Sequence, residues 1–374
     1  MKRFFALMAA VVLALYGFSC VKQEAVTSPV KSAQSVADVR QQVSLSEKQR
    51  GVSWVGGPQV VVQDDLAALV KNHVNWIVQT PFGWQQDYDS PHVELSTEAN
   101  WWGETDTGLV ATAQLAENAG IHTLLKPHIW LTRPSEGKWR GEIEMSSEED
   151  WQAWFESYRR FILHYATLAE THNMPILCIG TELQVTAVKR EQDWRELIAE
   201  IRQVYAGKLT YAGNWHNGFE TIPFWDALDF IGIQAYFPLT DQRNPTVEML
   251  QAGWQPHIEA IERVQKQYQK PVIFTEMGYR SVDDAAIAPW EWPAPGAETR
   301  PTEFSTASGL ATQAKCYEAF FQTVWPKDWL AGVYVWKWFP KLSAASGERV
   351  GQGFTPQHKP AEGVIRDAFM PREA

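Results

Sequence analysis

Eight short apolar runs, each ending in polar or aromatic residues, recur along the chain from residue 51 onward and alternate with longer helical patterns. They are Gly51–Gly56, Val74–Thr80, His122–His128, Ile176–Glu182, Leu209–Trp215, Phe230–Tyr236, Val272–Glu276 and Gly332–Trp338. Alternating strands and helices indicate parallel strands joined by crossover helices. Eight such units, with no glycine-rich phosphate loop after the first, favour a closed barrel over an open nucleotide-binding sheet. We therefore predict an α/β fold, a single-domain (β/α)8 TIM barrel.

Five longer segments between these runs carry apolar residues at the spacing of an amphipathic helix. The clearest has Trp151, Trp154, Tyr158 and Ile162 three or four residues apart. Residues at this spacing share one face of a helix, which packs on the sheet. We predict helices over Thr107–Ala119, Glu148–Thr171, Asp193–Tyr205, Thr246–Gln269 and Thr312–Thr323.

The first residues of the chain have the pattern of an export signal. Lys2 and Arg3 precede an apolar stretch at 4–15, which is too short to span a membrane as a helix. Cys20 follows small residues and resembles the lipidated cysteine of a bacterial lipoprotein, although Gly17 stands where leucine is usual. We predict a signal peptide at 1–19 and lipidation of Cys20, with plain secretion as the alternative.

Residues 20–46 are rich in Val, Gln, Ser, Ala and Lys and contain no aromatic residue. Such a composition is typical of a flexible tether between an anchor and a domain. We therefore expect an anchored tether at 20–46 and a catalytic domain at 47–374. The expected location is the cell envelope, with membrane contact only through the N-terminal lipid, or else the periplasm or the medium.

Composition narrows the class of partner. The net charge of −11 argues against nucleic acid, because phosphate binding requires clustered Lys and Arg. The chain contains 19 Trp residues, more than a core alone requires. Aromatic platforms for sugar rings would account for part of them, and packing for the rest.

The cysteines and histidines suggest neither a disulfide framework nor a metal site. Apart from Cys20, the chain contains only Cys178 and Cys316, both in apolar patterns, so we expect two buried free thiols, although one disulfide is possible in an exported protein. No Cys or His spacing fits a metal site, and we expect no cofactor.

In such barrels the chemistry lies at the carboxyl ends of the strands. The polar and aromatic residues at or just after these ends include Trp84, Lys126, His128, Thr181, Glu182, Asn214, Trp215, Tyr236, Glu276 and Trp336. Glu182 and Glu276 end the fourth and seventh runs. Glycoside cleavage uses two carboxyl groups, one to protonate the leaving oxygen and one to attack or stabilise the anomeric carbon. We therefore predict these two as catalytic, the alternative being structural ion pairs or helix caps.

Several segments together resemble glycoside hydrolase family 113 of clan A, which is known for β-1,4-mannanases. They are Leu125-Lys-Pro-His-Ile, Ile179-Gly-Thr-Glu-Leu, Ala212-Gly-Asn-Trp, Ile231-Gly-Ile-Gln-Ala-Tyr-Phe-Pro-Leu, Phe274-Thr-Glu-Met-Gly-Tyr-Arg-Ser and Val333-Tyr-Val-Trp-Lys-Trp. The resemblance runs from about residue 48 to the end of the chain and is specific only in combination.

The resemblance implies a role for each matching position. Glu182 would be the acid/base, Glu276 the nucleophile, and Tyr236 the hydrogen-bond donor that orients the nucleophile. Trp336 would form the floor beneath the attacked sugar. Further residues would line the cleft with less defined roles, namely Asn214, Trp215, His128 and Lys126.

One position departs from the pattern of clan A. Many of its members have Asn before the acid/base, in contact with the sugar 2-hydroxyl, whereas this chain has Thr181. The Thr181 hydroxyl can still form hydrogen bonds, but its reach differs. Because mannose and glucose differ at that carbon, the preferred sugar stays open.

A proline-rich segment from Pro289 to Pro301 follows the seventh run and contains Trp290 and Trp292. Irregular loops of this length are more often functional than filler, so we predict a cleft wall there, with packing as the alternative.

The predicted function is a retaining glycoside hydrolase that acts inside β-1,4-mannan or glucomannan chains through a glycosyl-enzyme intermediate. The expected partner is a polysaccharide or oligosaccharide. Two alternatives stay open: another clan A hydrolase, such as a β-glucanase or an exo-β-mannosidase, and an inactive carbohydrate-binding lipoprotein.

Overall fold

The computed structural model describes residues 47–95, 101–291, 305–342 and 351–371. Eight parallel strands form a closed barrel in the order β1-β11-β10-β9-β8-β7-β5-β2, which confirms the predicted (β/α)8 fold. The strands are β1 (Gln49–Trp54), β2 (Trp76–Gln79), β5 (His122–Leu125), β7 (Ile176–Thr181), β8 (Lys208–Asn214), β9 (Ile231–Gln234), β10 (Val272–Met277) and β11 (Leu330–Trp338).

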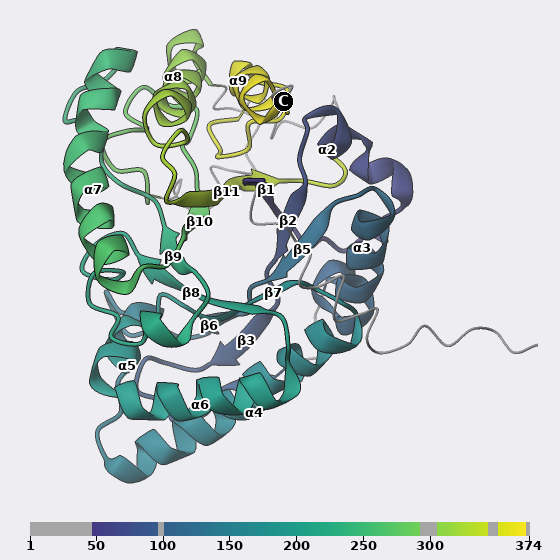
Figure 1. Cartoon of the computed structure of the whole chain (residues 1–374), viewed down its shortest axis with the longest axis vertical. Coiled ribbons are helices and arrows are strands. Elements are labelled where there is room, and N and C mark those ends of the chain that lie inside the picture. Colours follow the sequence, from purple (N-terminus) through teal and green to yellow (C-terminus); the bar gives the residue numbers. More distant parts are fainter. Residues whose placement is uncertain (1–46, 96–100, 292–304, 343–350, 372–374) are drawn as a thin grey trace, which may run out of the picture. The chain divides into compact units, whose positions relative to one another are not determined.

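Helices lie around the outside of these strands (Figure 1). They are α2 (Ala67–Lys71), α3 (Asp106–Asn118), α4 (Glu148–Thr171), α5 (Gln184–Lys189), α6 (Glu191–Val204), α7 (Val247–Tyr268), α8 (Ala307–Thr323) and α9 (Pro360–Phe369). Four short 3-10 turns are η1 (Gln63–Leu66), η2 (Trp102–Glu104), η3 (Arg140–Glu142) and η4 (Trp225–Ala227). The five predicted helices are present; α8 begins five residues before the predicted start, and the short α2, α5 and α9 were not predicted.

Burial on both sides explains why the strands read as near-continuous apolar runs. All six residues of β7 and all six of β10 are buried between the helices and the barrel interior. Four helices start at a hydroxyl residue whose side chain accepts a hydrogen bond from the third helical N–H, as expected for N-caps: Thr105, Ser147, Thr246 and Thr306. For α3, α4, α7 and α8, a local cap therefore fixes the residue at which the helix begins.

A second, three-stranded sheet has the order β4-β3-β6 and was not predicted. It consists of β3 (Phe82–Gln85), β4 (Glu94–Leu95) and β6 (His128–Leu131). The second and third barrel strands end earlier than predicted, at Gln79 and Leu125. Beyond Pro81 and Pro127, the chain continues as β3 and β6, which pair with each other. A proline has no N–H to donate to a ladder, so it interrupts each strand at the same level.

Cys178 and Cys316 are buried free thiols, as predicted. Within the described ranges, no helix is long and apolar enough to cross a membrane. The predicted signal peptide, Cys20 and the tether all lie outside the described residues, as does Trp292.

Candidate active site

Strand register brings the two glutamates to one level at the carboxyl end of the barrel. Asn214 on β8 pairs in register with Gln234 on β9, and Gln234 pairs with Glu276 on β10. Glu182 follows β7 directly, and its N–H donates to the Ala212 carbonyl of β8 at 2.8 Å. The structure therefore places both predicted carboxylates around the same rim, although 94 residues separate them in the chain.

Both carboxylate oxygens of Glu276 are held by hydrogen-bond donors. The Tyr236 hydroxyl donates to Oε2 at 2.7 Å, and the Lys126 ammonium contacts Oε1. Glu276 is 4% exposed and Lys126 is fully buried. Because a buried charge is costly unless it is paired, the ammonium and the carboxylate stabilise one another as ions. Glu276 is thus a fixed anion at the floor of the site.

Lys126 reaches Glu276 from the opposite side of the barrel. It follows β5, the third barrel strand, whereas Glu276 lies on β10, the seventh, and in a ring of eight these strands face each other. Its ammonium also lies 3.4 Å from Gln234 Oε1 and 3.4 Å from the Thr275 carbonyl. Lys126 was predicted to line the cleft, and the structure places it on the predicted nucleophile.

Glu182 has a different set of partners. The Asn214 amide donates to Oε1 at 2.7 Å, while Arg140 donates to Oε2 from Nη2 at 2.8 Å and from Nε at 3.2 Å. The backbone of Glu182 has φ = 56°, in the left-handed region that non-glycine residues seldom occupy. Such strained positions concentrate at functional sites, where the surrounding structure holds them.

Sequence reasoning missed Arg140. It lies in η3, within the loop after β6, and has no periodic pattern around it that would place it. The available signal was its position in a loop at the carboxyl end of a barrel strand, where residues that contribute to chemistry are found. Ile143 and Met145 are buried and anchor the end of this loop.

The electrostatics of the site fix two protonation states. Burial, followed by the negative charge of Glu276 and then that of Glu182, raises the pKa of Tyr236 well above its usual value. Burial, followed by the positive charges of Lys126 and Arg140, lowers the pKa of His128 well below its usual value. Tyr236 therefore stays a protonated donor and His128 stays neutral.

His128 has an unused polar atom in the site. Its Nε2 lies 3.7 Å from Glu276 Oε1, which is too long for a hydrogen bond, and has no partner among the described residues. This buried nitrogen therefore has a hydrogen-bonding capacity that none of the described residues uses.

Aromatic side chains lie near the carboxylates. Trp336 is partly exposed on β11, while Trp338 on the same strand is 2% exposed and packs deeper. The peptide bond between Trp336 and Lys337 is cis. Trp215 follows Asn214 and stacks on Trp290 with ring centroids 4.7 Å apart. Trp290 is 41% exposed, so this pair presents an aromatic surface beside the strand that carries Asn214.

The remaining two predicted residues differ in their surroundings. Thr181 is 1% exposed, and its hydroxyl lies 3.5 Å from the Pro127 carbonyl and 3.9 Å from Cys178 Sγ. Trp84 lies on β3 in the small sheet and is partly exposed. Across the described part of the chain, no group of three or more His, Cys, Asp or Glu is arranged to hold a metal.

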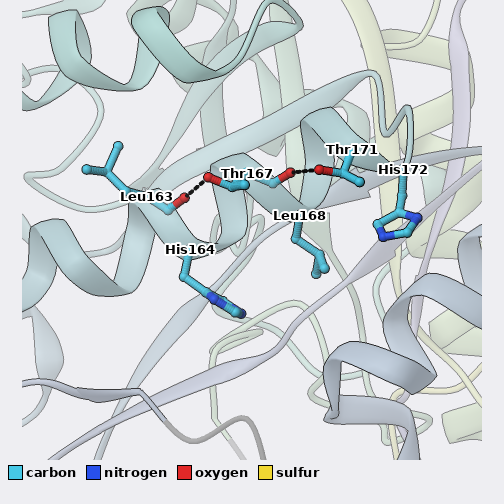
Figure 2. Close-up of a pocket in the computed structure, with 6 residues that line it drawn as sticks. All are labelled: Leu163, His164, Thr167, Leu168, Thr171 and His172. Carbon is cyan, nitrogen blue, oxygen red and sulfur yellow. Dashed lines mark hydrogen bonds between the residues drawn. The ribbon is translucent and has the colours of Figure 1, made fainter.

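A separate pocket of about 400 Å³ lies along α4 and contains none of these residues (Figure 2). Leu163, Thr167 and Thr171 line it, and the two threonine hydroxyls donate to carbonyls of their own helix at 2.9 and 2.8 Å. His164, also in its wall, contacts Asp106 at 3.0 Å. The two threonines and His164 therefore already have partners, and the pocket is lined by neither of the two carboxylates.

A (β/α)8 barrel with two carboxylates at strand ends four and seven, set among aromatic and amide side chains, defines a glycosidase. The model of glycoside hydrolase family 113 matches residues 58–359. The chain belongs to that family.

Solved structures agree with the family. A family 113 β-1,4-mannanase, solved as a complex, is 27% identical and superposes with a TM-score of 0.71 over 87% of this chain and 100% of its own. The family 113 β-mannanase from Alicyclobacillus acidocaldarius, in complex with ManMIm, is 29% identical at a TM-score of 0.71, covering 86% and 97% of the two chains. A β-glucuronidase from Ruminococcus gnavus shares the fold alone, at 15% identity and a TM-score of 0.56 over 86% and 50% of the chains. No curated protein sequence matches the chain.

Proposed function

We propose that this glycosidase hydrolyses β-1,4-mannan or glucomannan within the chain and with retention of anomeric configuration. The proposal rests chiefly on the two carboxylates that the barrel holds at the ends of its fourth and seventh strands. Tyr236 and Lys126 hold Glu276, whereas Asn214 and Arg140 hold Glu182. The β-1,4-mannanase activity named for the two family relatives supports mannan as the substrate.

In the first step, a Glu276 oxygen attacks the anomeric carbon while Glu182 delivers its proton to the leaving glycosidic oxygen. The bond from the anomeric carbon to that oxygen breaks, and a glycosyl ester forms on Glu276. The Tyr236 hydroxyl, 2.7 Å from Oε2, fixes the carboxylate plane during the attack. Because the donors are already in place, little reorganisation is needed as charge moves.

In the second step, Glu182 takes a proton from water, and the resulting hydroxide equivalent displaces Glu276 from the anomeric carbon. Two inversions give net retention. Ester formation removes the negative charge of Glu276, and Lys126 is then a buried cation whose other contacts are two oxygens at 3.4 Å. This unpaired charge destabilises the covalent intermediate relative to the free enzyme and so favours its hydrolysis.

The test combines two variants with product analysis. Glu276→Ala should abolish turnover of mannan and glucomannan, whereas Glu220→Ala, which removes a 41% exposed carboxylate paired with Arg263, should leave it unchanged. Proton NMR of early wild-type products should show the β-anomer first, and product sizing should show mixed oligosaccharides. First appearance of the α-anomer would overturn retention. Release of mannose alone would overturn internal cleavage. If neither mannan nor glucomannan gave a product and β-glucan released sugars, the proposed substrate would be wrong.

We also propose that the chain is exported and anchored through a lipid on Cys20, since a positive start, a short apolar stretch and a cysteine follow in order. Expression with a labelled fatty acid tests this. We expect the wild-type protein to carry the label and to stay in the membrane fraction. The Cys20→Ser variant should carry no label and should be released from the membrane. Equal release of wild type and variant, without label, would favour plain secretion.

A further inference from the structure

The three-stranded sheet β4-β3-β6 has two faces of opposite character. One face carries Gly83, Gln85, Ile129 and Leu131, all of which are buried. A Cβ at Gly83 would lie 2.6 Å from the Phe161 ring of α4. Glycine at this position therefore allows the sheet to pack closely against the Phe161 ring of α4.

The opposite face is aromatic. In the parallel pairing of β3 with β6, Phe82 lies opposite His128 and Trp84 opposite Trp130, so all four side chains point to the same side. The Phe82 ring is 6.1 Å from Trp84 and 6.0 Å from Trp130. Trp130 is 51% exposed. A solvent-facing sheet surface normally carries polar residues, so two indoles side by side indicate a binding surface.

This face is continuous with the catalytic centre. His128, whose Nε2 is 3.7 Å from Glu276 Oε1, contacts Phe82 edge-on with ring centroids 5.7 Å apart. A row therefore runs from the nucleophile through His128 and Phe82 to Trp84 and Trp130. At the same level, Glu94 on β4 pairs with Trp84 and is exposed, which adds a carboxylate beside the indoles.

We propose that Phe82, Trp84, Trp130 and Glu94, the aromatic shelf, bind sugar residues of the same polysaccharide chain beyond those at the cleaved bond. The apolar faces of β-1,4-linked pyranose rings would stack on the indoles, and the Glu94 carboxylate would accept hydrogen bonds from their hydroxyls. The shelf lengthens the site on one side and so favours the binding of long chains over short ones. This inference rests on the proposed function, because it takes the occupant to be the hydrolysed chain.

The experiment compares a long with a short substrate in variants of the shelf. Trp130→Ala removes an exposed ring with little risk to folding, and Trp130→Phe is its matched control because it keeps an aromatic face. For mannohexaose, Trp130→Ala should raise KM about tenfold, the effect of losing roughly 60 Å² of apolar contact, with kcat unchanged. For an activated aryl mannobioside, both constants should stay at the wild-type values. Trp130→Phe should retain most of the affinity.

A second measurement does not depend on turnover. Mannohexaose should quench tryptophan fluorescence of Glu182→Gln protein, which lacks the acid but keeps the buried Lys126–Glu276 pair, and adding Trp130→Ala should weaken its binding by the same factor. Equal KM values in wild type and Trp130→Ala for the long substrate, with equal binding, would overturn the shelf while leaving the proposed function intact. Absence of any mannan hydrolysis by the wild type would instead refute the proposed function, and the binding measurement would then decide the shelf separately.

Discussion

Removal of one hydroxyl from the site gives the sharpest test of how the nucleophile is held. In Tyr236→Phe the ring can stay where it is, between the Phe354 ring at 6.3 Å and the Glu276 carboxylate, because only the oxygen is lost. Glu276 keeps the Lys126 contact, so its charge remains compensated. The variant should therefore fold and should lack a single donor to Oε2.

The magnitude follows from the geometry. The lost bond is 2.7 Å long, joins a neutral donor to a charged acceptor and is almost excluded from water, with 9% of Tyr236 and 4% of Glu276 exposed. Hydrogen bonds to charged groups contribute about 1.5–3 kcal/mol, so kcat/KM should fall about 10- to 100-fold. Because the hydroxyl acts on the attacking group, we expect the loss in kcat, with KM nearly unchanged.

The assay is steady-state kinetics on a manno-oligosaccharide, together with thermal unfolding of both proteins. Since the pKa of Tyr236 lies well above its usual value, the hydroxyl keeps its proton, and the ratio of wild-type to variant kcat should stay constant from about pH 5 to pH 8. A loss smaller than about twofold would refute the idea that this bond orients the nucleophile. A ratio that changes steeply across this range would refute the assignment of a protonated donor.

Three further changes probe the other charged groups. Arg140→Met should lower kcat on polysaccharide about 10- to 100-fold but much less on aryl glycosides with good leaving groups, because Arg140 acts through the acid Glu182; equal losses on both would contradict this. Lys126→Met leaves the nucleophile as an uncompensated buried charge, so the free energy of unfolding in urea should fall by about 3–5 kcal/mol, and an unchanged midpoint would count against the ion pair. Burial lowers the pKa of Lys359 from 10.5 to about 7, so between these values the unfolded chain holds a proton that the folded chain lacks, and wild-type stability should rise with pH relative to Lys359→Met. Urea titrations at about pH 6 and pH 9 measure this difference, and a wild type that gains less than the variant would contradict it.

The barrel could be predicted because its strands are buried on both faces. A run such as Ile176–Thr181 has no polar residue until its end, and the change from apolar to polar marks the rim where the chemistry lies. The same signal located Glu182 and Glu276. The small sheet was not predictable in this way, because Pro81 and Pro127 interrupt its strands and its aromatic face lacks the alternation of apolar and polar residues by which a half-buried strand is recognised.

The pairing of charges was harder to predict than their location. Lys126 stands at a strand end that the sequence shows, yet which carboxylate it contacts depends on closure of the barrel, which sets the third strand opposite the seventh. Arg140 comes from a loop that contacts α5 and is bonded to the Tyr88 carbonyl through the Glu144 N–H, both remote in sequence. These contacts give the two glutamates different partners: an ammonium and a phenol hold Glu276, and a guanidinium and an amide hold Glu182. Because the residue type is the same at both positions, the difference between nucleophile and acid/base has to arise from these surroundings, which are a property of the closed fold and not of either local motif.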